Sequence, residues 1–251
     1  MTSPRLEDRW RALRRTLLPL VLGGLALAPA AAPAEQIGFA LSLRGIQAGE
    51  LLMNGKVEGR GYAASGLLRT TGLLGMLRRV SFSAQSTGGL SGNRYAPARY
   101  VEKADTGKRR SEATLRYRRG VPEVVSYAPP RAPNPRDVDP ATQKGTVDPM
   151  TAIFAALRDQ PAAGICQLDL RVFDGRRASR VRVDSPRPQA GGAVQCAGEY
   201  RRVAGFSERE MAEKTRFPFT ITYEPAAAGM MRAAEISLDT LYGTGRLTRR
   251  K

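Results

Sequence analysis

Apolar and polar residues alternate along most of the chain beyond residue 35. The clearest runs are Ile37 to Leu43, Val80 to Phe82 and Phe217 to Tyr223, in which every second residue is apolar. Because the side chains of a strand point alternately to its two faces, this period predicts β-strands that are buried on one side. Breaks such as Asn54-Gly55 and Gly88-Gly89 separate the runs. The pattern therefore predicts an all-β fold, either a single curved antiparallel sheet or an open barrel.

One helix interrupts the strand pattern. Asp148 can accept hydrogen bonds at a helix N-terminus, and Pro149 suits the first helical position. Apolar residues then follow at helical spacing: Met150, Ile153, Phe154 and Leu157. Pro161 and Gly164 end the pattern, so we predict a helix from Asp148 to about Gln160. Its apolar face favours a capping helix that covers the opening of the sheet.

A tight hairpin is predicted where Phe173 is followed by Asp174 and Gly175. Asp-Gly between alternating runs favours a two-residue type I′ turn, because both positions tolerate a positive φ. This two-residue turn fixes which residues of the two strands lie directly opposite one another. Leu168 then faces Val181, and Asp169 faces Arg180 on the other side of the sheet.

The first 34 residues have the pattern of a cleavable export signal. A basic start precedes an apolar run from Thr16 to Ala28, and Ala32-Pro33-Ala34 offers small residues at the cleavage point. The apolar run is too short for a membrane span, which needs about 20 residues. The pair Arg14-Arg15 also resembles a twin-arginine signal, but the ordinary Sec route is favoured. We expect a periplasmic protein with one β-rich domain over residues 35–251.

The chain contains two cysteines, Cys166 and Cys196. In an oxidising compartment an isolated pair predicts a disulfide. In a simple meander two strand spacings of about 4.8 Å would separate these residues, whereas bonded Cα atoms lie about 4.4–6.8 Å apart. Three solutions remain open: Cys166 lies at a fraying strand end, the third strand pairs elsewhere, or the bond crosses a closed interior.

Two further segments are less regular. Residues 128–147 contain five prolines, which indicates either a loop exposed to solvent or a flap beside a site. Residues from Gly72 to Val80 form a short apolar segment that ends in Arg78-Arg79. A helix there could dip into a membrane surface, although a plug at one end of the sheet is favoured.

Charge and composition narrow the chemistry. The formal net charge of +17 suits an anionic partner, or else a basic surface that only contacts solvent. Export makes lipid headgroups or acidic glycans better candidates than nucleic acid. Histidine is absent, which excludes Ser-His-Asp and Cys-His catalysis and histidine-based metal sites.

The aspartates show no clear arrangement that could take over the catalytic or metal-binding roles of histidine. Asp137, Asp139 and Asp148 form a loose acidic group whose spacing matches no calcium loop, so we expect no metal. Asp169 and Asp174 are the acids that would be tested for glycan hydrolysis, which needs two carboxylates about 5–10 Å apart. We expect no cofactor and no enzymatic activity.

Several motifs occur together in this chain. The most specific is the Phe173-Asp174-Gly175 hairpin with its flanking cysteines. The others are the Asp148-Pro149-Met150 helix start, Gly45 to Gly49, Pro97-x-x-Tyr100 and Ala204-Gly205-Phe206. With these motifs the chain resembles a family of exported proteobacterial proteins that is known as domain of unknown function 3108. The resemblance implies a strongly curved antiparallel sheet, similar to the half-barrels that carry lipoproteins or bind lipids. It implies no enzyme activity, and no functional residue carries over.

Two functions fit these observations. The leading hypothesis is non-enzymatic binding of an apolar or anionic amphiphilic component of the cell envelope, such as a lipid or lipoprotein, with peripheral membrane contact. It expects Phe39, Leu41, Phe219 and Ile221 to divide between the core and a ligand cavity. The alternative is a structural or adaptor protein that docks a protein partner through its sheet edge or proline-rich loop. No ligand-binding residue can be assigned from the sequence alone.

Overall fold

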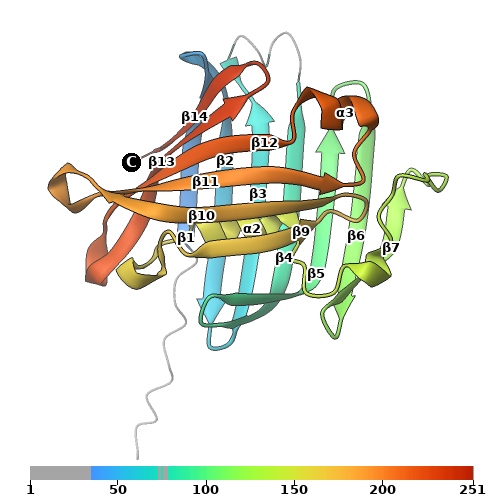
Figure 1. The fold of residues 1–251 in the computed structure, drawn as a ribbon, viewed down its shortest axis with the longest axis horizontal. Helices are drawn as coiled ribbons and strands as arrows, with labels where there is room; N and C mark the ends of the chain where they lie inside the picture. The colour runs from blue at the N-terminus through green and yellow to red at the C-terminus, as the bar shows by residue number, and fades with distance from the viewer. Residues whose placement is uncertain (1–34, 73–74, 76–78, 251) are drawn as a thin grey trace, which may run out of the picture. The chain divides into compact units, whose positions relative to one another are not determined.

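A computed structural model describes residues 35–72, 75 and 79–250 (Figure 1). The predicted export signal, residues 1–34, and most of the predicted Gly72–Val80 helix lie outside these residues. The first half of the chain contributes β1 (Glu35–Leu43), β2 (Ile46–Glu58), β3 (Gly61–Thr70), β4 (Ser81–Ser91), β5 (Arg94–Asp105), β6 (Arg110–Arg118) and β7 (Val121–Ala128). The second half contributes α2 (Pro149–Leu157), β8 (Gln160–Pro161), β9 (Leu168–Phe173), β10 (Ala178–Pro188), β11 (Val194–Ala204), α3 (Glu208–Glu213), β12 (Arg216–Pro225), β13 (Met230–Thr240) and β14 (Gly243–Arg249).

The strands form one 14-stranded sheet in the order β7-β6-β5-β4-β3-β2-β1-β14-β13-β12-β11-β10-β9, with β8 beside β13. The neighbouring strands of this order are antiparallel. Because β1 pairs with both β2 and β14, the two halves of the chain extend from a shared centre, and β7 and β9 remain as edges. The predicted all-β class with an open antiparallel sheet is therefore confirmed.

The sheet curls so that α2 lies between its two halves (Figure 1). The helix contacts β3, β4 and β5 on one side and β9 and β13 on the other. We call the side of the sheet that faces α2 the inner face. The capping helix of the sequence prediction thus lies inside the curl and not over its opening.

Helix α2 begins as predicted and ends earlier. Asp148 caps it, since its carboxylate accepts a hydrogen bond from the backbone N–H of Thr151 at 2.8 Å. The helix ends at Leu157, because the next residues turn into an extended segment that pairs with β13 as β8. Ile153 is 39% exposed, whereas Ala152 and Ala155 are buried. The buried surface of the helix is therefore wider than the predicted apolar face.

Two glycines of the sheet make room for this helix. A Cβ atom at Gly55 of β2 would overlap the ring of Phe154, and one at Gly66 of β3 would lie 2.9 Å from the sulfur of Met150. Both helix residues are almost completely buried. Because glycine has no side chain, these two positions allow α2 to pack close to the sheet.

The β9–β10 hairpin exists, but the predicted two-residue turn and its register are wrong. Leu168 pairs with Val183 and Asp169 with Arg182, which is a shift of two residues from the expected partners. The loop is longer because the Asp174 carboxylate accepts hydrogen bonds from the backbone N–H groups of Arg176 and Arg177, at 2.8 and 2.7 Å. A shift by an even number keeps the apolar residues on the inner face.

The disulfide between Cys166 and Cys196 is present, with a Cα–Cα distance of 5.3 Å. Cys196 lies on the inner side of β11, whereas Cys166 precedes the first residue of β9 and has a φ of +56°. Of the three solutions considered, the first applies: Cys166 has already left the strand, so its chain can reach past β10.

The proline-rich segment 128–147 is held by specific contacts. The backbone N–H of Val138 donates to the carbonyl of Arg176, and Asp137 forms ion pairs with Arg131 and Arg176 at 2.7 and 3.3 Å. Its end forms a parallel bridge from Val147 to β9. The segment therefore links the two edges of the open sheet.

Candidate functional site

Among the residues that the structure describes, one part of the inner face is accessible to solvent. Near the β1–β2 and β13–β14 turns, the inner face carries apolar side chains that are only partly covered. Leu68 and Phe82, which pair across β3 and β4, are 38% and 43% exposed. The half-buried members of the same region are Leu41, Leu43, Phe217, Phe219 and Leu238. We call these seven residues the inner mouth.

The cross-strand register shows that these side chains point inward. Leu68 pairs with Leu51, which pairs with the fully buried Phe39. On the other half of the sheet, Phe219 lies two residues from Ile221, which is 1% exposed, on the same face of β12. Phe39 and Ile221 therefore belong to the core, while Leu41 and Phe219 lie at the accessible end.

Cations and aromatic rings adjoin the inner mouth at α3. The Arg202 guanidinium lies 5.3 Å from the ring centre of Phe206 and 5.0 Å from that of Phe217. The Arg177 guanidinium lies 4.9 Å from the Phe206 ring centre and forms an ion pair with Glu210 at 3.3 Å. Arg202 also donates to the backbone carbonyl of Lys214 at 2.9 Å, so its position is fixed. Fixed guanidinium groups beside an apolar surface suit an anionic group on an apolar body.

A carboxyl group faces the same interior. Glu102 of β5 accepts a hydrogen bond from the Tyr100 hydroxyl at 2.7 Å. Glu102 lies two residues from Ala104, which pairs with Phe82 of the inner mouth. Burial raises the pKa of Glu102, and the nearby Asp174 acts in the same direction. A carboxyl group in this position can donate a hydrogen bond when it is protonated.

The interior around α2 is a packed polar network. The buried Asp148 carboxylate accepts hydrogen bonds from the Ser86 hydroxyl at 2.8 Å and the Thr151 hydroxyl at 2.7 Å. The Tyr62 hydroxyl lies 2.6 Å from that of Thr151. Burial raises the pKa of Asp148 and raises that of Tyr62 to about 12. These contacts fix the start of α2 to β3 and β4, so we assign the network a structural role.

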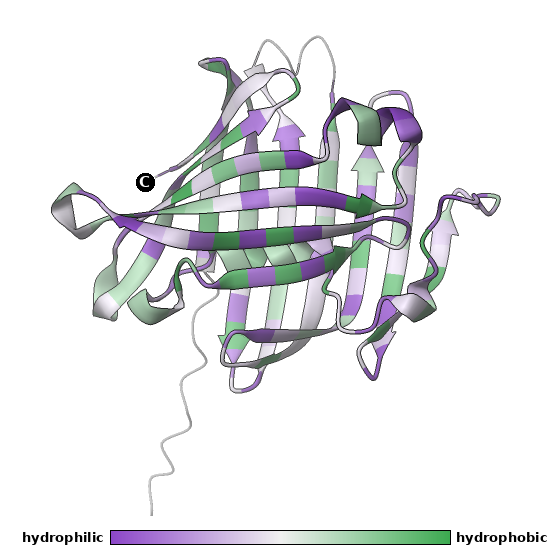
Figure 2. Ribbon diagram, viewed as in Figure 1, coloured by the Kyte–Doolittle hydropathy of each residue, from purple (hydrophilic) through white to green (hydrophobic). Residues whose placement is uncertain are grey.

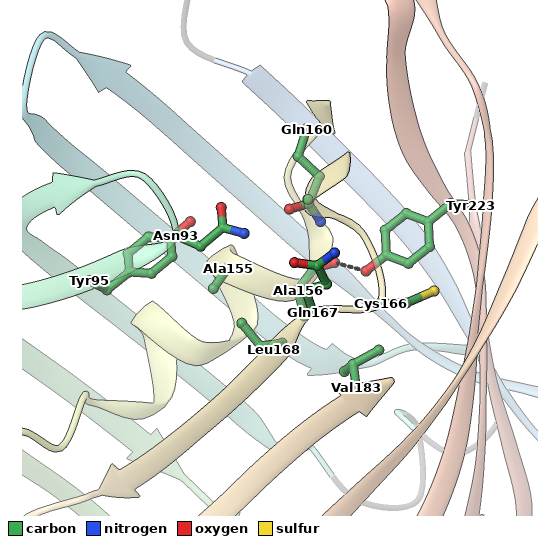
Figure 3. Close-up of a pocket in the computed structure, with 11 residues that line it drawn as sticks. Asn93, Tyr95, Ala155, Ala156, Gln160, Cys166, Gln167, Leu168, Val183 and Tyr223 are labelled. Atoms are coloured by element: carbon green, nitrogen blue, oxygen red, sulfur yellow. Dashed lines mark hydrogen bonds between the residues drawn. The ribbon is translucent and has the colours of Figure 1, made fainter. Parts of the chain in front are cut away.

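A small pocket lies beside α2, and Figure 3 shows the polar and apolar side chains that line it, together with the disulfide residue Cys166. Its volume is about 10 Å³, which is too small for anything larger than water. The Tyr223 hydroxyl beside it donates to the carbonyl of Ala156 at 2.7 Å. An apolar ligand at this end of the interior would have to displace α2.

The acids considered from the sequence do not form a catalytic pair. Asp169 is exposed on the outer face and bonds Arg180 through both of its oxygens, whereas Asp174 caps its own loop. Nor do Asp137, Asp139 and Asp148 meet, since Asp137 pairs with arginines and Asp139 caps the short helix Pro140–Thr142. Within the residues that the structure describes, no group of three or more Cys, Asp or Glu side chains could hold a metal.

The structure places the residues to which the sequence gave structural roles as follows. Asp148 and Pro149 start α2 and Phe173 ends β9, whereas Asp174 and Gly175 lie in a longer loop than the predicted two-residue turn. Sequence reasoning missed α3, although Ser207 and Glu210 have the spacing of a capping box that the structure contains. It also missed Glu102, which no local pattern marks.

None of the helices among the described residues is long and apolar enough to cross a membrane.

Comparisons with known proteins give a family but no activity. The model of a family described as protein of unknown function (DUF3108) matches residues 38–186. The fold is similar to that of a β-barrel-like protein of domain of unknown function DUF1849 from Brucella abortus, at 12% identity and a TM-score of 0.47, over 87% of this chain and 96% of that one. The comparison with curated proteins found no match. Since the family model covers more than half of the sequence, the chain belongs to the DUF3108 family.

Proposed function

We propose that this protein binds an apolar or amphiphilic component of the cell envelope, without catalysis, at the inner mouth. The observation that carries the proposal is the exposure of inward-facing apolar side chains, with Leu68 and Phe82 about two-fifths exposed. A folded chain usually buries such residues, since each Å² of apolar surface removed from water contributes about 25 cal/mol. A ligand with an apolar chain would cover this surface.

The surroundings of the inner mouth support an anionic headgroup. Arg202 lies against the rings of Phe206 and Phe217 beside it, and Glu102 with its raised pKa adds a hydrogen-bonding group inside. An apolar body with a few placed polar groups is the usual composition of a ligand site. The disulfide is consistent with the periplasmic location that we propose.

Native mass spectrometry of the protein purified from its own periplasm tests this proposal. We expect a bound amphiphile that organic extraction releases. Leu68→Trp with Leu238→Trp would narrow the inner mouth, so this variant should fold and lose the ligand. Val125→Trp is the matched control, because Val125 is 50% exposed on the edge strand β7. Equal ligand recovery from all three proteins would contradict the proposal.

A second candidate function, docking of a protein partner, is favoured by the edge strand β9. A groove of about 740 Å³ runs between β9 and the β4–β5 turn and is lined by Asp169, Leu170 and Arg171 on the β9 side. Val147 already bonds this edge at Arg171 and Phe173, so an extended peptide could add only to the first residues of β9. Photo-crosslinking in cells from a residue placed at Asp169 would give one defined product if this occurs. A reactive residue at Val125 serves as the control, and equal products from both positions would reject it.

A further inference from the structure

Four arginines form a row across the outer face of the second half of the sheet. Arg180 of β10 pairs directly with Arg171 of β9 and with Arg201 of β11, and Arg201 pairs with Arg216 of β12. All four are exposed. They alternate with inward-facing neighbours such as Val181 and Tyr200, and Figure 2 shows this alternation of hydrophilic and hydrophobic bands along β9 to β12. We call these residues the arginine row.

Like charges directly opposite one another destabilise a sheet. The carboxylates nearby compensate only part of the row. Arg180 bonds Asp169, and Arg216 lies 3.6 Å from Glu199. Arg171 donates to a backbone carbonyl, that of Lys144, and Arg201 has no carboxylate within ion-pair distance among the described residues. Arg171 and Arg201 therefore present guanidinium groups whose charge the protein leaves uncompensated.

A groove with no acidic residue runs along one side of the row. Its volume is about 520 Å³, and its basic lining residues are Arg171, Arg180, Arg201 and Arg202. Val203 and Met211 add apolar surface. On the other side of the row, a groove of about 320 Å³ is lined by the carboxylates of Asp184 and Glu199 as well as by Arg180, Arg182, Arg201 and Arg216. The groove without acidic residues therefore has the more positive charge and is the more favourable site for an anion.

We infer that the arginine row is a binding site for a ligand with several phosphate groups. Guanidinium groups bind phosphate through two parallel hydrogen bonds, which makes arginine well suited to this anion. The three members of the row that line the groove without acidic residues, Arg171, Arg180 and Arg201, span two strand spacings, or about 10 Å, so one ligand with several phosphates can contact all three side chains. Such phosphates occur on a lipid surface or on a free oligophosphate. The arginine row lies on the outer face, opposite the inner mouth, although its groove also reaches Arg202, which contacts Phe217 of the inner mouth. The inference rests on Arg171 and Arg201 and does not depend on the proposed function.

Calorimetric titration with inorganic tripolyphosphate, and co-sedimentation with phosphatidylglycerol vesicles, test the inference. We expect binding that weakens as salt rises. Arg171→Gln with Arg201→Gln should weaken it about thirtyfold, since each arginine near an anionic surface contributes about a factor of five. Both side chains are exposed, so the variant should keep the urea midpoint of the wild type.

A matched control carries the same loss of charge elsewhere. Arg99 and Arg116 are exposed and pair directly across β5 and β6 in the other half of the sheet. Arg99→Gln with Arg116→Gln should leave binding within about twofold of the wild type. The site is supported if either probe binds the wild type and the Arg99/Arg116 variant, and if this binding is weakened only in the Arg171/Arg201 variant. The probe that binds, vesicles or tripolyphosphate, identifies a lipid surface or a free oligophosphate as the source of the phosphates. Equal weakening by both variants, or no binding of either probe to the wild type, would overturn the inference.

Discussion

Replacing Phe154 with alanine tests whether α2 is a structural part of the interior. The ring is 1% exposed and packs against Tyr62, with ring centres 6.0 Å apart, and against Tyr95, at 6.4 Å. Gly55 has no side chain and so leaves room for this ring. Removing a fully buried phenylalanine side chain costs about 3–5 kcal/mol, because it combines the lost transfer free energy with an unfilled cavity. For a domain of this size that corresponds to a fall in Tm of about 6–20 °C.

Urea unfolding followed by circular dichroism measures this change as a lower midpoint at an unchanged slope. The matched control is Ile153→Ala on the same helix, where the side chain is 39% exposed. We expect that control to cost less than about 1 kcal/mol. If Phe154→Ala and Ile153→Ala differed by less than about 0.5 kcal/mol, α2 would not fill the sheet, and a ligand could take its place.

Three further predictions concern stability. Gly55→Ala should lower the free energy of unfolding by about 1–3 kcal/mol, because its Cβ overlaps the Phe154 ring; urea titration checks this, and neutrality would show that the ring can move. Replacing both Cys166 and Cys196 with serine should cost about 3–4 kcal/mol for a 30-residue separation, and adding reductant to the wild type should reproduce most of that loss in the same titration. The pKa of Glu50 is lowered by hydrogen bonds from Arg69 and Arg250, so its contribution is present above the unfolded pKa of about 4.3 and is lost as pH falls through the lowered value. Glu50→Gln should therefore flatten the acid side of the stability–pH curve, and an unchanged curve would refute this assignment.

Local patterns in the sequence determined the elements of this fold. Alternating residues such as those from Ile37 to Leu43 predict strands because the two-residue period is a property of one extended segment. The cap of α2 at Asp148 and the pairing of the only two cysteines likewise follow from short-range or counting arguments. These features needed no knowledge of which strands are neighbours.

The tertiary structure decided how the elements meet, since those contacts join residues that are distant in sequence. Asp174 lengthened its loop by bonding two backbone N–H groups, which moved the β9–β10 register by two residues. Gly55 and Gly66 admitted α2 to the interior, where its neighbours come from both halves of the chain. The inner mouth and the arginine row depend on the same cross-strand registers. A hydrophobic pattern gives the face on which a side chain lies, but the packing of the whole sheet decides whether that face is covered.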